Sequence, residues 1–349
     1  EGQYRNLPVK AQIKRWKQMF DSPEGSMALR IKTNIRHPDP AFRDRVIFRI
    51  SDRSHVRVGK KYRVWPLLDF SWAIDDHLLG VTHIIRGKEL MIEGEMQKYI
   101  WDIFKWKHPE IIYVGLLKLE GIDGKVSKSK SQKEVASGMY SGWDDPRTWS
   151  IQSLARRGIL AESFREFIEK IGLNQNDINV PIDELYSINR KKIDKSSNRY
   201  FFVKDPVKTS VKNSPNIKSI KLKLHPDKNE EKKINVGNEF YVALKDFSEL
   251  KNKDVRLMHL FNINLDKKSE FVSEENNPNI KKIHWVNADD RESIKTRIMM
   301  VDGIWANGVA EKNIKDLKIG TIVQFERFGF CRFDRVNENG EYEFWYTHD

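Results

Sequence analysis

Cysteine is almost absent from this chain of 349 residues, because Cys331 is the only one. A single thiol excludes a disulfide framework and any zinc ribbon made of several cysteines. The chain also has no run of about 18 uncharged apolar residues, which excludes a membrane-spanning helix. Residues 1–6 contain neither an initiator methionine nor the apolar stretch of a signal peptide. We therefore expect a soluble, cytoplasmic protein, and we expect this sequence to be a piece of a longer one.

The composition also excludes a disordered tail protein. Aromatic residues make up 11% of the chain and hydrophobic residues 39%, so there is ample apolar surface to bury. The 62 Lys+Arg exceed the 50 Asp+Glu, which gives a net charge of +12. This excess favours a polyanionic partner, although lysine-rich chains are often simply solvated. The length predicts several domains, and no repeat of fixed period is present.

Helical and strand periodicities alternate in the first part of the chain. Residues 9–20 carry apolar side chains at helical spacing, and residues 27–33 and 45–50 alternate as strands do. Residues 62–70 enter a further strand.

A βαβ unit follows. Residues 81–86 are rich in β-branched side chains and predict a strand, and residues 88–107 predict a long helix that ends before Pro109. Residues 111–117 form an uninterrupted apolar run, as expected for a strand buried on both faces of a parallel sheet. One such unit is too small to make a stable doubly wound domain.

The second half of the chain changes from helices to strands. Residues 145–173 and 181–194 predict helices. Beyond residue 198 the sequence predicts short strands, of which the last two form a hairpin with an Asn339-Gly340 turn. Many short strands with polar turns predict one or two β-barrels.

The clearest local motif is a lysine- and serine-rich segment at residues 121–131, after the second strand of the βαβ unit. Its glycines permit an open loop, and interleaved lysines and hydroxyls suit phosphate oxygens. A disordered surface loop is the plainer alternative. The position favours a ligand site, because ligands bind beyond the carboxyl ends of parallel strands.

This segment resembles a known signature. Residues 125–129, Lys-Val-Ser-Lys-Ser, are similar to the second signature loop of class I aminoacyl-tRNA synthetases. Together with residues 67–77, 80–89, 142–148 and 154–159, they resemble the glutamyl/glutaminyl subfamily in its archaeal and eukaryotic form. Five motifs stand in the family's order, and the resemblance covers nearly the whole chain.

The resemblance implies a two-step reaction. Glutamate is activated by ATP, which Mg²⁺ accompanies, and is then transferred to the 3′-terminal adenosine of tRNA(Glu); whether tRNA(Gln) is a second acceptor stays open. Lys128 is expected to stabilise charge on the leaving pyrophosphate, assisted by Lys125, Ser127 and Ser129. We expect no bound organic cofactor, no metal site in the protein and no membrane partner, and we expect a monomer.

Arg86 is the residue expected to choose the amino acid. In glutamyl enzymes an arginine on this strand pairs with the γ-carboxylate of the substrate, whereas the glutaminyl enzymes have a cysteine there. A guanidinium offers two parallel donors to a carboxylate and has no comparable match for a neutral amide. Asp69 and Trp72 match positions of the same pocket, but Leu68 replaces a tyrosine that many relatives have. An exposed arginine in a surface ion pair is the alternative.

The predicted barrels carry basic residues that suit RNA. Arg199, Arg327 and Arg332 are the candidate tRNA-binding residues, Arg199 by its match to a position that contacts an anticodon base in the glutaminyl relatives. Lysines are spread through the same strands, at positions 204, 208, 212, 218, 221 and 223. We expect basic groups to hold phosphates. Most phenylalanines here are expected to fill the barrel cores.

Several other polar residues suggest structural roles. His77 and His83 have no carboxylate–histidine spacing typical of a metal site, so a structural or substrate-positioning role is preferred. Asp75 and Asp76 are interpreted as a loop cap and as charge at a helix N-terminus. Asp144 or Asp145 is expected to cap a helix whose first turn tolerates Pro146.

The fold class expected is α/β plus all-β, in four parts. Residues 1–67 resemble an acceptor-end-binding insertion, and 68–117 the second half of a Rossmann-type catalytic domain. Residues 118–197 resemble a helical connecting domain, and 198–349 two β-barrel anticodon-binding domains. The first catalytic half, with its His-x-Gly-His ATP loop, has no counterpart here, so we expect this chain alone to be inactive. The main hypothesis is a glutamate-tRNA ligase; a glutaminyl-tRNA synthetase and a non-catalytic tRNA-binding protein derived from a synthetase are the alternatives.

Overall fold

The computed structural model describes residues 2–122 and 127–349. The chain divides into two compact units, of which the first comprises Glu1–Lys118 and Ile171–Val180. The second comprises Leu119–Lys170 and Pro181–Asp349. Lys125 lies outside the described residues, and the four-part division expected from the sequence stays a prediction.

The first unit begins with a helix against a small antiparallel sheet of order β1-β2-β3. The elements are α1 (Val9–Met19), β1 (Ala28–Arg30), β2 (Val46–Ile50) and β3 (Val64–Pro66). Trp16 of α1 packs edge-on against Phe48 of β2, with their ring centroids 5.1 Å apart. The apolar face of the predicted helix therefore covers the sheet, and both the helix and the first two strands are confirmed.

The strand predicted over residues 62–70 is wrong beyond Pro66. A helix, α2 (Leu68–Leu78), begins two residues later. Pro66 has no N–H for a sheet, and Asp69 places a negative charge in the first helical turn, where the helix dipole favours it. Of the apolar residues that suggested a strand, Leu68 is exposed in the first turn of this helix, and Phe70 packs against Phe48 of β2.

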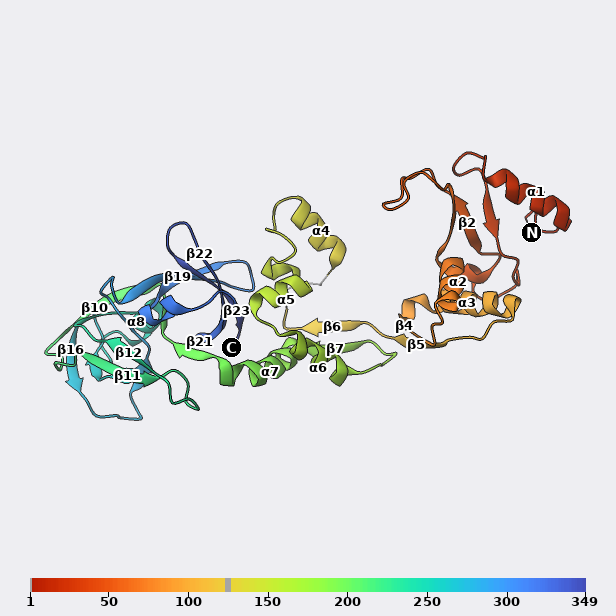
Figure 1. Cartoon of the computed structure of the whole chain (residues 1–349). Helices are drawn as coiled ribbons and strands as arrows, with labels where there is room; N and C mark the ends of the chain where they lie inside the picture. Colours follow the sequence, from red (N-terminus) through yellow and green to blue (C-terminus); the bar gives the residue numbers. More distant parts are fainter. Residues whose placement is uncertain (1, 123–126) are drawn as a thin grey trace. The chain divides into compact units, whose positions relative to one another are not determined.

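The βαβ unit is confirmed. It consists of β4 (His83–Gly87), the short 3₁₀ helix η2 (Lys88–Leu90), α3 (Met91–Phe104) and β5 (Glu110–Val114). The two strands are parallel, and Arg86 is aligned with Tyr113. Helices α2 and α3 lie side by side (Figure 1), and the indole of Trp101 donates to the Ala73 carbonyl between them.

The burial expected for the second strand is not observed. Within the described residues β4 and β5 form a sheet of two strands, and residues 111–114 are only half-buried. An apolar run indicates that a strand will be covered, but the number of neighbouring strands is set by the rest of the fold.

The second unit starts with helices. Short strands β6 (Leu117–Glu120) and β7 (Ile178–Pro181) lie where the chain passes between the units. The helices are α4 (Lys128–Ala136), η3 (Pro146–Thr148), α5 (Ile151–Arg157), α6 (Ala161–Ile171), α7 (Ile182–Ile193) and η4 (Asp194–Ser196). Of the two aspartates expected as a cap, Asp145 caps the helix that begins with Pro146, and its carboxylate accepts from the Arg147 N–H at 3.1 Å.

Two barrel-like sheets complete this unit. The C-terminal sheet contains β8 (Asn198–Tyr200), β9 (Phe202–Lys204), β19 (Ser293–Met299), β20 (Trp305–Glu311), β21 (Ile322–Phe325), β22 (Gly329–Val336) and β23 (Tyr342–His348). Its edge strands, β8 and β9, are separated by one residue, so the sheet curls until its edges meet. The 3₁₀ helix η5 (Lys312–Asp316) follows β20.

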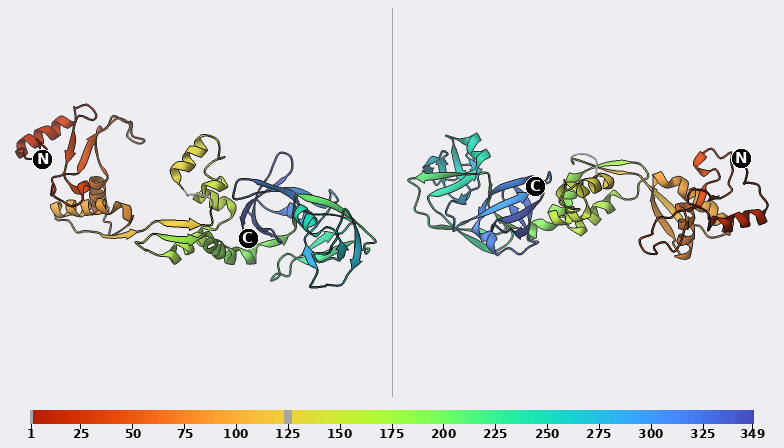
Figure 2. Two further views of the ribbon diagram at one scale, coloured as in Figure 1. Left: turned by 180° about the vertical axis from the view of Figure 1, so that it is seen from behind. Right: turned by 90° about the horizontal axis from the view of Figure 1, so that it is seen from above.

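The inserted sheet lies in the chain between β9 and β19. It contains β10 (Pro206–Lys212), β13 (Glu239–Ala243), β14 (Asp254–Leu257), β15 (Asn262–Asn264), β16 (Lys268–Ser273), β17 (Lys281–Ile283) and β18 (Val286–Asn287), with α8 (Leu244–Leu250) beside it. Its edge strands, β17 and β18, are again close in sequence. A separate pair, β11 (Ser219–Lys223) and β12 (Glu231–Asn235), forms a hairpin. The two sheets contact each other through β9 and β13, and the views in Figure 2 draw them side by side.

Aromatic side chains fill the sheet interiors, as predicted. Phe325, Phe330 and Phe333 are each at most 2% exposed, and Phe201 and Phe202 are fully buried. The predicted hairpin is confirmed as β22 and β23, with Gly340 at φ +77° in its turn. Among the described residues no helix has the length and apolar character needed to cross a membrane.

Candidate functional site

A buried arginine lies at the end of strand β4. The Arg86 side chain is only 9% exposed, and its guanidinium carbon lies 4.5 Å from the ring centroid of Trp72 on α2. Its Nη1 donates to Oε1 of Gln97 on α3. The structure thus brings together Arg86 and Trp72, two of the three residues predicted for one pocket.

Arg86 has no carboxylate partner among the residues that the structure describes: no ion pair within 4.0 Å is formed by its guanidinium. Buried charges in proteins are ordinarily paired, because removing an ion from water is costly. The π face of Trp72 and the neutral amide of Gln97 compensate this charge only in part. A site with a desolvated, unpaired guanidinium suits a ligand that carries a carboxylate.

Asp69, the third predicted residue of this pocket, is bonded elsewhere. Its carboxylate, 2% exposed, accepts from Nε of Arg45 at 2.7 Å, and Nη2 of Arg45 donates to Glu93 at 2.7 Å. Burial raises the pKa of Asp69 above its ordinary value, and the hydrogen bond and charge of Arg45 only partly oppose this. Asp69 of α2 and Glu93 of α3 are therefore bridged by Arg45, which immediately precedes β2.

The interpretation of Asp75 and Asp76 as charges at a helix N-terminus is wrong. Both residues lie near the C-terminal end of α2, and Asp76 accepts from Nε2 of Gln97 at 2.9 Å. One turn of helix thus separates Asp76 from Trp72 on the face toward α3. The ring of His77 stacks on the ring of Trp106, with their centroids 3.8 Å apart. Nε2 of His83 lies 3.4 Å from Oε2 of Glu110.

The predicted phosphate loop leads into helix α4. Ser127 is its N-cap, and its hydroxyl accepts from the Lys130 N–H at 3.4 Å. Lys128 and Ser129 are exposed in the first turn, which has no acidic residue. A helix N-terminus that carries basic side chains in its first turn favours an anion. Lys125 is not among the described residues, so the structure gives no position for it.

The three arginines predicted to bind tRNA are each bonded within the second unit. Arg327 donates to both carboxylate oxygens of Asp246 at 2.8 and 2.9 Å, so this carboxylate compensates the charge of Arg327. Nη1 of Arg332 lies 3.4 Å from Asp334. Arg199 lies 3.8 Å from Asp194 and is half-buried.

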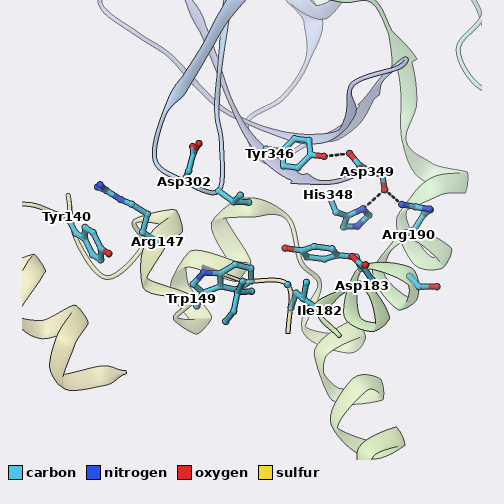
Figure 3. Close-up of a pocket in the computed structure, with 15 residues that line it drawn as sticks. Tyr140, Arg147, Trp149, Ile182, Asp183, Arg190, Asp302, Tyr346, His348 and Asp349 are labelled. Atoms are coloured by element: carbon cyan, nitrogen blue, oxygen red, sulfur yellow. Dashed lines mark hydrogen bonds between the residues drawn. The ribbon is translucent and has the colours of Figure 1, made fainter. Parts of the chain in front are cut away.

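A cavity of about 770 Å³ opens in the second unit and contains none of the predicted site residues. Figure 3 shows aromatic walls, including Trp149, and Arg190 and His348 bonded to Asp349. Behind this wall Arg157 is fully buried; it donates to Tyr186 and to the backbone of β23. These bonds attach helix α5 to the last strand of the C-terminal sheet.

Three family models match the chain. The catalytic domain of "tRNA synthetases class I (E and Q)" matches residues 3–195, which is more than half of the chain. The anti-codon binding domain of the same class matches residues 197–285, and a second such model matches residues 282–334. This chain belongs to the class I tRNA synthetases of the E and Q type.

Relatives of this synthetase chain include three archaeal proteins named glutamate–tRNA ligase. That of Archaeoglobus fulgidus is 41% identical over 345 residues, which cover 97% of this chain and 61% of the relative. That of Pyrococcus furiosus is 42% identical over 356 residues (96% and 61%), and that of Methanocaldococcus jannaschii 38% over 349 residues (96% and 62%). The chain thus spans about three-fifths of the length of these relatives.

Among solved structures, the chain is similar to a glutamate-tRNA synthetase from Elizabethkingia anophelis. The sequences are 17% identical, the match covers 54% of this chain and 42% of that one, and the TM-score is 0.32. The family models establish the fold class: a class I synthetase catalytic part followed by barrel-like anticodon-binding domains.

The residue that sequence reasoning missed in this synthetase is Gln97. It lies on the buried face of α3 between Met96 and Ile100, and it is fully buried. An amide at an apolar-face position was the available signal, because buried polar side chains need partners.

Proposed function

We propose that this chain is the major part of a glutamate-tRNA ligase, which activates glutamate with ATP and transfers it to the 3′-terminal adenosine of tRNA(Glu). The observation that carries the proposal is the buried Arg86 guanidinium with no carboxylate partner among the described residues. The names of the archaeal relatives support the same activity.

In this proposal Arg86 selects glutamate by its charge. The γ-carboxylate of glutamate supplies the negative charge that the pocket lacks, whereas the amide of glutamine supplies none. The discrimination is strong because a substrate without the carboxylate leaves a desolvated cation unpaired. This argument disfavours the alternative of a glutaminyl-tRNA synthetase.

Phosphate chemistry is assigned to the N-terminus of α4. ATP enters as a substrate with its Mg²⁺, and Lys128 stabilises charge on the pyrophosphate as it leaves, with Ser127 and Ser129 as hydroxyl donors. Lys125 has the same role by its place in the motif. The exposure of Lys128 in a first helical turn without acidic residues supports this assignment.

The two sheets of the second unit are proposed to bind tRNA(Glu) at its anticodon end, as the names of the matching family models suggest. We propose the same four domains as the sequence predicts, at 1–67, 68–117, 118–197 and 198–349. We place the protein in the cytoplasm, where it acts as a monomer.

Charging assays on the natural full-length protein test the proposal. Labelled glutamate, ATP and a tRNA(Glu) transcript are the substrates, and a tRNA(Gln) transcript and labelled glutamine are the comparisons. We expect glutamate to be charged. Arg86→Ala and Arg86→Cys should each lower kcat/KM for glutamate by roughly 100-fold, because each removes one partner of a buried charge pair.

Arg165→Ala is the matched control, because Arg165 is exposed on α6 of the second unit. It should leave the kinetics for glutamate unchanged. Unchanged glutamate kinetics in both Arg86 variants would remove Arg86 from the site. Tight binding of tRNA(Glu) without any charging would favour the non-catalytic tRNA-binding protein instead.

A further inference from the structure

We propose that Gln97, oriented by Asp76, is a positioning residue that keeps the Arg86 guanidinium unpaired and directed to a substrate carboxylate. This inference rests on the proposed function, because it concerns the same amino-acid site. It adds Asp76 of α2 and Gln97 of α3 as specificity-determining residues beside Arg86, which the sequence identified.

The hydrogen bonds around Gln97 permit one orientation of its amide. Asp76 as a carboxylate only accepts, so it must face the Nε2 group of Gln97, at 2.9 Å. The Arg86 guanidinium only donates, so it must face Oε1. A flip of the amide would place two donors against each other at one end and two acceptors at the other. Asp76 therefore determines that an acceptor points at Arg86.

The position of Gln97 makes these two bonds necessary. Its side chain lies in the core between α2 and α3 and is 0% exposed to solvent. A buried amide that loses one partner retains the cost of its desolvation. Gln97 is thus anchored at both ends, and it holds Arg86 by Nη1 while Trp72 covers the face of the same guanidinium.

The neutrality of Gln97 is the property that matters for specificity. A glutamate at this position would be of nearly the same size and would form an ion pair with Arg86, so the charge of the guanidinium would be compensated before a substrate bound. With an amide, the nearest carboxylate of this network is Asp76, which is bonded to the far end of Gln97. The substrate is left to provide the full counter-charge.

Gln97→Glu tests the charge argument. The new carboxylate competes with the γ-carboxylate of glutamate, so KM for glutamate should rise by roughly 100-fold. The preference for glutamate over glutamine, measured as the ratio of kcat/KM values, should narrow by about the same factor. KM for ATP and the affinity for tRNA(Glu) should stay near the wild-type values, which a merely structural defect would not permit.

Two further variants separate positioning from folding. Gln97→Met keeps the volume of the buried side chain but removes the acceptor, and KM for glutamate should rise by roughly tenfold with a smaller change in kcat. Asp76→Asn alters only the half-exposed partner and frees the Gln97 amide to flip. It should raise KM for glutamate by about threefold without loss of the fold. Lys98→Met, at the adjacent exposed position of α3, is the control.

The outcomes distinguish this inference from the proposed function. If Arg86→Ala impairs glutamate use while Gln97→Glu and Asp76→Asn leave both KM and the glutamate preference unchanged, the proposed positioning role is overturned and the proposed function stands. If Arg86→Ala itself has no effect on glutamate use, the proposed site is overturned together with the role of Gln97.

Discussion

A neutral buried histidine illustrates how single residues of this chain respond to pH. His284 follows β17, and its Nδ1 lies 3.1 Å from Nη1 of Arg327. Because a guanidinium only donates, this nitrogen must be unprotonated and accept. Burial first, and then the charge of Arg327, lowers the pKa of His284 to about 4, although Asp246 opposes the shift. Folding thus requires this ring to stay neutral.

The free energy of unfolding should therefore fall as the pH is lowered from about 6.5 to about 4. The unfolded chain binds a proton at His284 below about pH 6.5, whereas the folded chain does so only near pH 4, so stability is full above the window and is lost across it. This residue contributes about 3 kcal/mol to that loss. His284→Gln keeps an acceptor for Arg327 and should make unfolding in urea less sensitive to pH between about 7 and 4.5.

The exposed His55 provides the control, and His55→Gln should retain the wild-type pH response. His348 has its pKa lowered to about 4, chiefly by burial, so part of the acid sensitivity should persist in His284→Gln. An identical pH response in His284→Gln and wild type would show that the ring does not titrate in the predicted way.

Residues with a motif around them were predictable from the sequence, and residues defined by tertiary partners were not. Arg86 was identified because its strand and its neighbours resemble a family motif, and the structure adds that it is buried. Gln97 and Asp76 carry no local signal of their bond, which joins two helices through residues 21 positions apart. Arg157 likewise stood in a recognised motif, but its burial against β23 depends on residues 190 positions away.

Among the elements, helix α3 approaches strand β5 at a glycine. A Cβ built at Gly94 would lie 2.0 Å from the Tyr113 hydroxyl oxygen and 3.1 Å from its Cζ. Helix propensity alone favours alanine over glycine by about 1 kcal/mol. The absence of a side chain at Gly94 leaves room for the ring of Tyr113, the residue of β5 that is aligned with Arg86.

Gly94→Ala should therefore destabilise the protein despite its better helix propensity. We expect a net loss of about 1–2 kcal/mol in the free energy of unfolding, because overpacking outweighs the propensity gain. The same change in a Tyr113→Phe background should cost less, since the closest atom is gone. Glu95→Ala, at an exposed position of α3, should cost little. A Gly94→Ala protein more stable than wild type would contradict the packing argument.

The elements themselves followed closely from periodicity. The α3 helix and the β22–β23 hairpin have strong local signals, which are the spacing of apolar residues and an Asn-Gly turn. Helix α2 was missed because its apolar residues follow directly on a strand, and a short apolar run fits either structure. Asp75 and Asp76 were misassigned for the same reason.

At the scale of the whole molecule, contacts between distant segments join the C-terminal sheet to the β11–β12 hairpin and to helix α8. Lys232 of β12 and Glu311 of β20 form a buried ion pair at 2.9 Å, and Lys232 also donates to the Arg199 carbonyl at 2.7 Å. Arg327 and Asp246 connect the β21–β22 turn with α8 of the inserted sheet. The sequence predicted barrels but not the insertion of one sheet within the other, because strand order is set by pairing across long separations.

Two of the arginines predicted to bind tRNA have carboxylate partners, whereas some of the nearby lysines have none among the described residues. Arg327 and Arg332 are engaged by Asp246 and Asp334. By contrast, Lys212 and Lys218 are exposed on the inserted segment, and neither forms an ion pair within the described part of the chain. Since the chain carries a net charge of +12, we expect these lysines to contact phosphates if the proposed tRNA-binding function holds.

The double change of Lys212→Gln with Lys218→Gln should thus reduce the salt dependence of tRNA(Glu) binding. Each phosphate contact that is lost lowers the slope of log affinity against log salt by about 0.7–0.9, so filter binding over a salt series should show a flatter line. Arg327→Gln should leave the slope unchanged and instead lower stability, because it leaves Asp246 buried without its partner. If Arg327→Gln reduces the slope and the lysine double variant does not, the lysine prediction is wrong and Arg327 contacts phosphate, as the sequence first indicated.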